Sequence, residues 1–185
     1  MKKFLVILLV LAVIPAAIFA KGFSVGIGAT ATTGSTISSV MEEQIQAIDT
    51  ENFNYGAYAN IKALVFSVNA TLFPKFVEGQ PIEFTGDLAA GLAVDISILR
   101  VQAGLSINYY GLTDFDEWEF HFENEDIMDA YLNVRAEVDI MLGDLNVGIW
   151  GILPTTATLN TLDKILEVQD RWQDASLGIS LGVCF

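Results

Sequence analysis

Apolar residues recur at every second position in eight stretches of the chain, and this is the period of a β-strand. The stretches cover about 22–32, 53–62, 64–73, 83–96, 99–110, 127–140, 145–154 and 176–185. One face of each stretch carries no charged residue, while the other is dominated by Gly, Ser, Thr and Asn with a few charges. A soluble sheet turns its polar face to water, whereas a membrane barrel turns its apolar face to lipid. The uniformly apolar face favours the barrel.

The connections between these stretches are an independent indication of the same fold. Short connections near Ala63, Ser97–Ile98 and Leu142–Asp144 alternate strictly with long ones. The long connections cover about 33–52, 74–82, 111–126 and 155–174. Outer-membrane barrels have tight periplasmic turns and large extracellular loops. The sequence therefore predicts an all-β fold, an eight-stranded antiparallel up-and-down transmembrane β-barrel with both termini in the periplasm.

Two of the long connections break the period of two. In 35–49 and in 160–173, apolar residues fall on one face at helical spacing. Amphipathic faces usually pack on their own protein, so we expect short helices in the external loops, lying over the barrel mouth.

The first 20 residues, MKKFLVILLVLAVIPAAIFA, have the composition of a secretory signal peptide. Two lysines precede an apolar run, Phe4–Ile14, that is too short for a comfortable transmembrane helix. We expect cleavage after Ala20, which leaves one barrel domain over residues 21–185. Cys184 is the only cysteine, so an internal disulfide is excluded.

The chain is strongly acidic, with 9 Lys and Arg against 23 Asp and Glu. Loss of Lys2 and Lys3 with the signal peptide leaves 7 basic residues against 23 acidic ones, a net charge of −16. Binding to nucleic acid depends on clustered basic residues. Nucleic acid is therefore not expected as a partner.

The chain ends in SLGISLGVCF, an alternating strand whose last residue is aromatic. In this feature and in its strand pattern, the mature chain resembles the family of small outer-membrane β-barrels of the OmpA, OmpX and OmpW type. The resemblance implies location in the outer membrane, contact with membrane lipid, and recognition of the last strand by the barrel-assembly machinery. The residues that would form this assembly signal are Leu177, Ile179, Leu181, Val183 and Phe185.

An eight-stranded barrel is only wide enough to be filled by side chains. Small inward residues on the first and last strands leave space that Tyr58, Tyr131, Trp150 and Arg135 can fill from the other side. The inward charged residues are expected to form a lumen charge network of Lys62, Asp87, Asp95, Arg100, Asp129, Arg135, Glu137 and Asp139. Charges in a confined lumen must be paired or hydrated. We favour a network that plugs the barrel over an ion path.

Catalytic and metal-binding signatures are absent from the sequence. His121 is the only histidine, and no serine lies near it in the acidic stretch 113–126. Clustered carboxylates attract Ca²⁺, but the stretch lacks the spacing of an EF-hand, so a hydrated acidic surface is favoured. No catalytic residue, metal or cofactor is predicted.

Trp118, Phe120 and Phe122 alternate with charged residues in the same loop. We expect the strand at 127–140 to begin early here, rise above the bilayer and carry a loop contact for a surface ligand or host molecule. The favoured function is a non-enzymatic surface protein with a structural or binding role through its loops. The alternatives are a narrow channel for small solutes and, less favoured, a lipid-modifying barrel enzyme.

Overall fold

The computed structural model describes residues 22–33, 53–77, 80–113, 118–122, 127–166 and 174–185. The strands among them are β1 (Phe23–Thr33), β2 (Phe53–Ala63), β3 (Phe66–Lys75), β4 (Ile82–Ile96), β5 (Leu99–Thr113), β6 (Trp118–Phe122), β7 (Tyr131–Leu142), β8 (Leu145–Thr158) and β9 (Ser176–Cys184). Two 3₁₀-helices, η3 (Ile127–Asp129) and η4 (Leu162–Leu166), interrupt them. The predicted signal peptide and the predicted helix over 35–49 lie outside the described residues.

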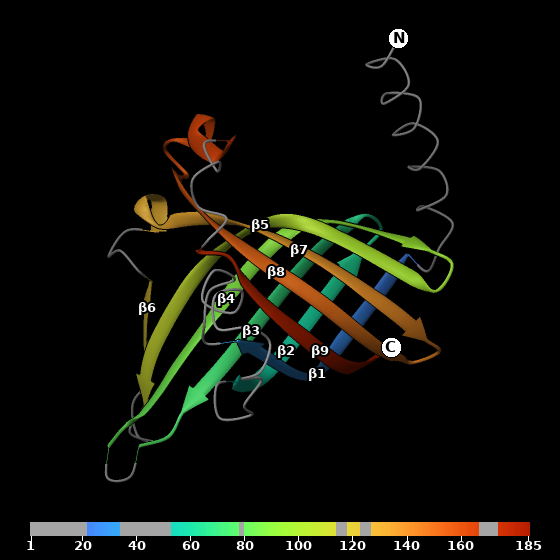
Figure 1. The fold of residues 1–185 in the computed structure, drawn as a ribbon, viewed down its shortest axis with the longest axis horizontal. Coiled ribbons are helices and arrows are strands. Elements are labelled where there is room, and N and C mark those ends of the chain that lie inside the picture. Colours follow the sequence, from blue (N-terminus) through green and yellow to red (C-terminus); the bar gives the residue numbers. More distant parts are fainter. Residues whose placement is uncertain (1–21, 34–52, 78–79, 114–117, 123–126, 167–173) are drawn as a thin grey trace, which may run out of the picture.

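The strands form one antiparallel sheet that closes on itself (Figure 1). The order β4-β3-β2-β1-β9-β8-β7-β5-β6, with a further pairing of β4 with β5, makes a ring of eight strands with β6 outside it. The last strand closes on the first, for example through Gly182 opposite Gly28. The predicted eight-stranded up-and-down barrel is confirmed.

Three two-residue turns lie at one end of the barrel, at Leu64–Val65, Ser97–Ile98 and Gly143–Asp144. The first residue of each turn has a positive φ, of 58°, 59° and 69°. This is the backbone of a type II′ turn, whose twist matches that of the flanking strands. Short connections therefore join strands at this end, which we call the tight-turn end.

The described ends of the chain lie at the tight-turn end as well (Figure 1). The amide of Leu64 donates to the carbonyl of Gly22 at 2.6 Å, and the amide of Cys184 donates to the carbonyl of Asp144 at 2.7 Å. The opposite end carries β6, η3 and η4 (Figure 1), and we call it the long-loop end. The alternation of short and long connections follows the sequence prediction.

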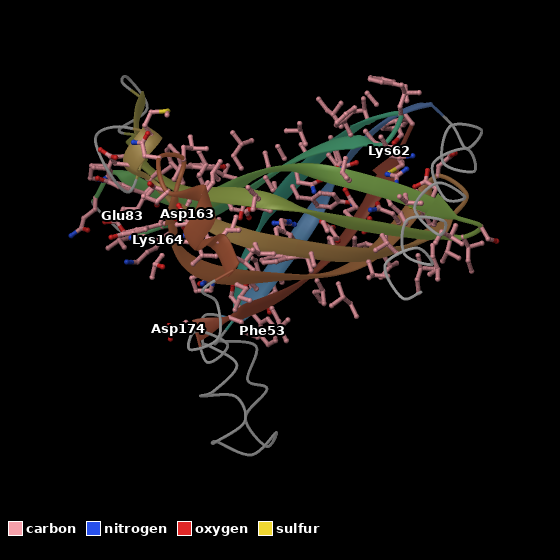
Figure 2. The ribbon with its side chains drawn as sticks, turned by 90° about the horizontal axis from the view of Figure 1, so that it is seen from above. Phe53, Lys62, Glu83, Asp163, Lys164 and Asp174 are labelled. Carbon is pink, nitrogen blue, oxygen red and sulfur yellow. The ribbon has the colours of Figure 1, made fainter. Side chains whose placement is uncertain are left out.

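Burial in this barrel is the reverse of burial in a soluble protein. Large apolar side chains project from the outer face all along the strands (Figure 2), and Ile149, for example, is 64% exposed. The largest fully buried side chains are all polar: Lys62, Thr71, Thr155, Asp139 and Ser106. Water-facing apolar surface on this scale is unfavourable, so the outer face needs an apolar medium.

Exposure at the long-loop end departs from the sequence prediction. Leu132 was expected outward but is buried, and Tyr131 was expected in the lumen but is exposed. The register between β7 and β8 shifts here, because Tyr131 lies opposite Thr158 and Asn133 lies opposite Pro154. Such a bulge locally disrupts the ladder and its alternation.

The predicted early start of the strand at 127–140 is wrong, because the structure has two separate strands. β6 pairs with β5 through Phe122 opposite Tyr109, whereas β7 pairs with β5 through Leu132 opposite Ile107. Between these two pairs the chain advances by ten residues from β6 to β7 but by only two residues along β5. The extra residues form an insertion that contains η3. In the last long loop, η4 covers part of the predicted helix. Among the described residues, no helix is long and apolar enough to cross a membrane.

Candidate functional site: the barrel lumen

Two aromatic side chains fill the lumen beside glycines of the first and last strands. A Cβ on Gly178 would run into the ring of Trp150, and a Cβ on Gly182 would meet the hydroxyl of Tyr58. The Trp150 Nε1 donates to Thr30 Oγ1 at 3.0 Å, and the Tyr58 hydroxyl donates to Asn146 Oδ1 at 2.8 Å. The small residues thus leave room for these rings, as the sequence indicates.

A basal cluster of Lys62, Asp95, Arg100 and Ser24 lies toward the tight-turn end. The Asp95 carboxylate accepts from Lys62 Nζ at 2.7 Å and from Arg100 Nε at 2.7 Å. Arg100 Nη2 also donates to Ser24 Oγ at 3.1 Å. Strands β1, β2, β4 and β5 are thereby tied together inside the barrel.

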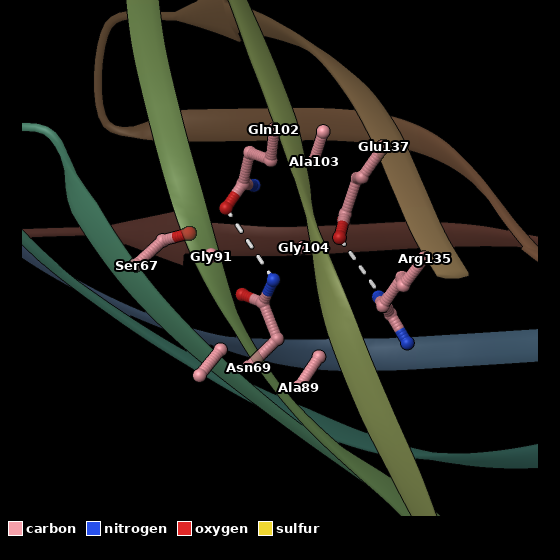
Figure 3. A pocket seen from close by; sticks show the side chains of 10 residues that line it. Ser67, Asn69, Ala89, Gly91, Gln102, Ala103, Gly104, Arg135 and Glu137 are labelled. Carbon is pink, nitrogen blue, oxygen red and sulfur yellow. Dashed lines mark hydrogen bonds and ion pairs between the residues drawn. The ribbon is translucent and has the colours of Figure 1, made fainter. Parts of the chain in front are cut away.

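An amide layer lies above the basal cluster. Gln102 Nε2 donates to Asp139 Oδ2 at 2.8 Å, and its Oε1 accepts from Asn60 Nδ2 at 3.2 Å. Asn60 also donates to Asn69, and Asn69 contacts Gln102 (Figure 3). These amides satisfy one another across β2, β3 and β5, as buried polar groups must.

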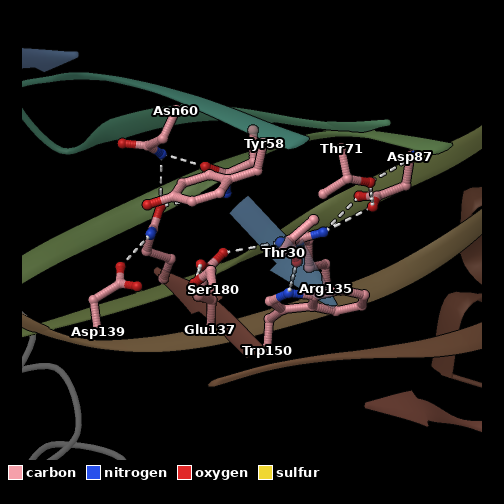
Figure 4. A network of polar contacts seen from close by, with 12 residues as sticks. Thr30, Tyr58, Asn60, Thr71, Asp87, Arg135, Glu137, Asp139, Trp150 and Ser180 are labelled. Carbon is pink, nitrogen blue, oxygen red and sulfur yellow. Dashed lines mark hydrogen bonds and ion pairs between the residues drawn. The ribbon is translucent and has the colours of Figure 1, made fainter. Parts of the chain in front are cut away.

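An upper cluster is organised by Arg135 of β7 (Figure 4). Its Nη1 lies 2.8 Å from both carboxylate oxygens of Asp87, and its Nη2 lies 3.1 Å from Glu137 Oε2. The guanidinium lies 4.6 Å from the centroid of the Trp150 ring, a cation–π contact. Thr71 donates to Asp87 from β3. Arg135 therefore connects β7 to β4 and β8.

The structure brings together seven of the eight residues expected in the lumen charge network. Asp129 is the exception and that expectation is wrong. It lies in η3 and is exposed, and it accepts from Asn160 Nδ2 at 3.2 Å. The strand begins at Tyr131 instead of about 127, so Asp129 precedes the barrel wall.

The other predicted site residues lie on outer elements. Leu177, Ile179, Leu181 and Phe185 are exposed on the outer face at β9, and Val183 shares that face and is half-buried. The backbone of Trp118, Phe120 and Phe122 forms β6 with His121, and their side chains lie outside the described set. No group of three or more His, Cys, Asp or Glu in the described residues is arranged to hold a metal ion.

The amide layer was missed by the sequence analysis, although a signal was present. Asn60 lies two positions before Lys62, and Gln102 lies two positions after Arg100, so both share the inward face. Only charged residues were selected on that face. Uncharged amides at neighbouring inward positions indicate the same lumen.

Described residues of the lumen line two cavities. One, of about 10 Å³, lies between the amide layer and Glu137 (Figure 3). The other, of about 430 Å³, opens toward the long-loop end, and we call it the vestibule. Asp87 and Trp150 are among its lining residues, with Asn54, Thr85 and Asn108.

Comparisons with known proteins give a remote likeness. No protein-family model matches the chain, and no curated protein matches it. Among solved structures, the crystal structure of Neisserial surface protein A (NspA) is similar with a TM-score of 0.42 and 15% identity, over 89% of this chain and 96% of that one. This likeness is too weak to carry a family or a function over to this chain. Membership of the OmpA, OmpX and OmpW type stays a prediction.

Proposed function

We propose that this protein is an outer-membrane β-barrel that is closed to solutes and acts through its long-loop end, in a structural or binding role. One observation carries the proposal: apolar side chains cover the outer face while paired charges, amides and two aromatic rings fill the lumen. A closed barrel is the only sheet that leaves no open edge in hydrocarbon. The cavity of about 10 Å³ beside the amide layer is near the minimum for one water molecule.

The proposal includes the orientation of the barrel. Tight turns and both described chain ends lie at one end, which would face the periplasm after removal of residues 1–20. The long-loop end would then face outward. The outward residues of β9 would contact lipid in the mature protein and serve the barrel-assembly machinery during insertion.

Two measurements test the closed membrane barrel. The detergent-folded protein should migrate as a compact band that shifts on boiling, and it should stay silent in planar lipid bilayers. A variant with Tyr58→Ala and Trp150→Ala, if it keeps the heat-dependent shift, should conduct because its lumen is emptied. Regular conductance steps from the unchanged protein would favour the narrow channel. Solubility without detergent, with no shift, would contradict the barrel in a membrane.

Binding at the long-loop end is proposed through β6. Within the described residues, β6 pairs with β5 alone, which suits strand addition by a protein partner. Replacing Trp118 and Phe120 with Ser should lower binding of the purified barrel to host or neighbouring cells while thermal unfolding is unchanged. A parallel loss of stability would show that the aromatic residues only seal the barrel top.

A non-enzymatic role is part of the proposal. His121 is the only histidine of the chain, and its backbone pairs with Tyr110 in the β5–β6 ladder. Incubation of the folded barrel with outer-membrane lipids should leave them unmodified. Lipid cleavage or acyl transfer that is lost in His121→Ala would contradict this part of the proposal.

A further inference from the structure

The lumen contains one more carboxylate than its cations can balance. The charged side chains of the described residues that lie inside the barrel are Lys62, Arg100, Arg135, Asp87, Asp95, Glu137 and Asp139. Three cations against four carboxylates leave a charge of −1. An uncompensated charge is unfavourable in a dry interior, so such a site binds a cation or gains a proton.

Asp139 is the carboxylate without a cation. Asp95 and Asp87 each form ion pairs at 2.7–2.8 Å, and Glu137 pairs with Arg135 at 3.1 Å. Asp139 Oδ2 accepts the amide of Gln102, at 2.8 Å. Its Oδ1 has no hydrogen-bond partner in the described structure, although the residue is only 1% exposed. The negative charge that the three cations leave unbalanced therefore lies at Asp139, and a bound cation or proton at Oδ1 would neutralise it.

Gly148 of β8 brings Asp139 and Glu137 to the same place. Asp139 Oδ1, Glu137 Oε1 and Ser180 Oγ all lie within 4 Å of the point where a Cβ of Gly148 would be. Asp139 and Glu137 are two positions apart on the inner face of β7 (Figure 4). The absent side chain thus opens a small space toward which both carboxyl groups point.

The groups that face this pair from other strands supply no second cation. Arg100 of β5 lies opposite Asp139 in the ladder, but its Nε is engaged with Asp95. Tyr58 of β2 and Cys184 of β9 also face the pair, and neither side chain carries a cationic group. Asn146 of β8 adds an amide, whose Oδ1 accepts from Tyr58.

The space at the pair is too small for a hydrated metal ion. A Cβ placed at Gly148 would already overlap Asp139 Oδ1 and Ser180 Oγ, so the space between these oxygens does not hold even a methyl group. A proton needs no such room. We propose that Glu137 and Asp139 form a binding site for one proton, shared between Glu137 Oε1 and Asp139 Oδ1. One carboxylate gains an O–H bond, the proton comes from solvent, and the other carboxylate accepts the hydrogen bond.

The proton makes the stability of the barrel depend on pH. In the unfolded chain both carboxyl groups are ionised above about pH 5, while the folded barrel retains one proton. Because the folded state binds more protons, the unfolding equilibrium constant should rise about tenfold per pH unit above that point. The rise ends at the pH where the folded pair loses its proton. Above that pH both carboxyl groups of the pair are ionised, and the lumen is destabilised beside Glu137 and Asp139.

The test compares unfolding of the full detergent-folded barrel in denaturant at several pH values from 5 upward. The unchanged protein should show the tenfold rise per pH unit, and D139N should lose it because a single carboxylate remains beside Arg135. D129N is the matched control, since Asp129 is exposed in η3, and it should retain the rise. Where D139N does not fold, E137Q replaces it with the same expectation.

Infrared difference spectra at pH 6 give a direct measurement. The carbonyl stretch of a protonated carboxyl group should be present in the unchanged protein and in D129N, and absent in D139N. Equal pH dependence in the unchanged protein and D139N, or no protonated carboxyl band at pH 6, would overturn the proposal. So would restoration of stability at pH 8 by Na⁺ or Ca²⁺ alone, since that result would identify a metal-ion site instead.

Discussion

The tight-turn half and the long-loop end of the barrel obey the sequence pattern to different degrees. In the tight-turn half, alternation gives the facing of each side chain correctly, with Ile149 on the outer face and Lys62 in the lumen. At the long-loop end Leu132 and Phe84, expected outward, are buried, and Tyr131, expected inward, is exposed. Alternation therefore predicts exposure only where the outer face is uncovered: Phe84 lies in continuous ladders opposite Pro74 and Gly111, yet its side chain is buried.

The cause of the difference is visible in the backbone. β8 carries Pro154, which has no N–H for the ladder, and the register with β7 shifts beside it. Thr155 Oγ1 then donates to the carbonyl of Leu132 at 2.5 Å. The positions of Tyr131 and Leu132 thus depend on this bulge as well as on the strand period.

The largest difference is expected between the buried ion pairs of the lumen and an exposed ion pair at the long-loop end. Arg135→Ala should destabilise the barrel by about 3–5 kcal/mol, because it leaves buried carboxylates without their partner. Lys75→Ala removes an exposed pair with Glu83, whose Nζ–Oε2 distance is 3.3 Å, at the long-loop end. That change should cost less than about 1 kcal/mol. Denaturant unfolding in detergent measures both values.

Equal losses of stability from Arg135→Ala and Lys75→Ala would contradict this expectation, because they would mean that the lumen is hydrated like the surface. Arg135→Lys tests whether the geometry of the guanidinium matters in addition to its charge. Lysine keeps the charge but loses the geometry that lets one guanidinium contact Asp87, Glu137 and Trp150 together. An intermediate loss is expected.

The outer face gives the next largest effect. Ile149→Arg should cost about 2–4 kcal/mol, the range for a cation on the lipid face near the bilayer midplane. Ile149 lies opposite Val138 and Ile179, in the middle of the outer wall. Leu162→Arg lies in η4 at the long-loop end, where Leu162 is also exposed, and should change stability by less than about 0.5 kcal/mol.

Folding into lipid vesicles of matched composition measures both changes. Similar tolerance of arginine at the two positions would show that the apolar outer face of the tight-turn half is not covered by lipid. This outcome would contradict the membrane proposal while leaving the eight-stranded ring in place.

The sequence predicted the strands, their order and the short turns because each depends on local period and connection length. Seven of the eight lumen charges were also found, since Lys62, Asp87 and the others occupy inward positions on regular strands. Asp129 was misplaced because the start of β7 depends on pairing with β8 and on the preceding insertion. The pairing partners, such as Lys62 with Asp95 across the barrel, depend on strand tilt and closure, which alternation does not encode.

A substitution at the end of β9 tests whether assembly into the membrane depends on this residue separately from the stability of the folded barrel. Phe185→Ala should lower the outer-membrane level of the protein several-fold while secretion continues, since the assembly signal proposed for β9 includes Phe185. The backbone bonds of Phe185 with Val25, at 2.8 and 3.1 Å, remain in this variant. Phe23→Ala is the matched control, because Phe23 is also exposed at this end, on the adjacent strand β1.

Quantitative surface labelling, with thermal unfolding of refolded samples, distinguishes the two steps. Both variants lose a similar aromatic contact with lipid, so their unfolding should change alike. A lower surface level for both, or for neither, would show that Phe185 carries no signal beyond its contact area.

The smallest effect expected concerns the turns that define the tight-turn end. Ser97 and Leu64 adopt positive φ without being glycine, and this conformation is unfavourable for a residue with a Cβ by roughly 1–2 kcal/mol. Glycine removes this penalty, but part of the gain in stability is offset by the extra conformational freedom of glycine in the unfolded chain. Ser97→Gly should therefore stabilise the barrel by about 0.5–1 kcal/mol.

Gly143 allows the reverse experiment at the equivalent turn position. A Cβ added there meets no atom within 4 Å, so Gly143→Ala introduces only the backbone penalty at φ 69°. It should destabilise by about 1 kcal/mol. Opposite signs for the two substitutions, measured by denaturant unfolding under one condition, are the expected result. If Ser97→Gly destabilised the barrel, the serine side chain would contribute more than its backbone strain, and the turns would not be interchangeable parts of a regular end.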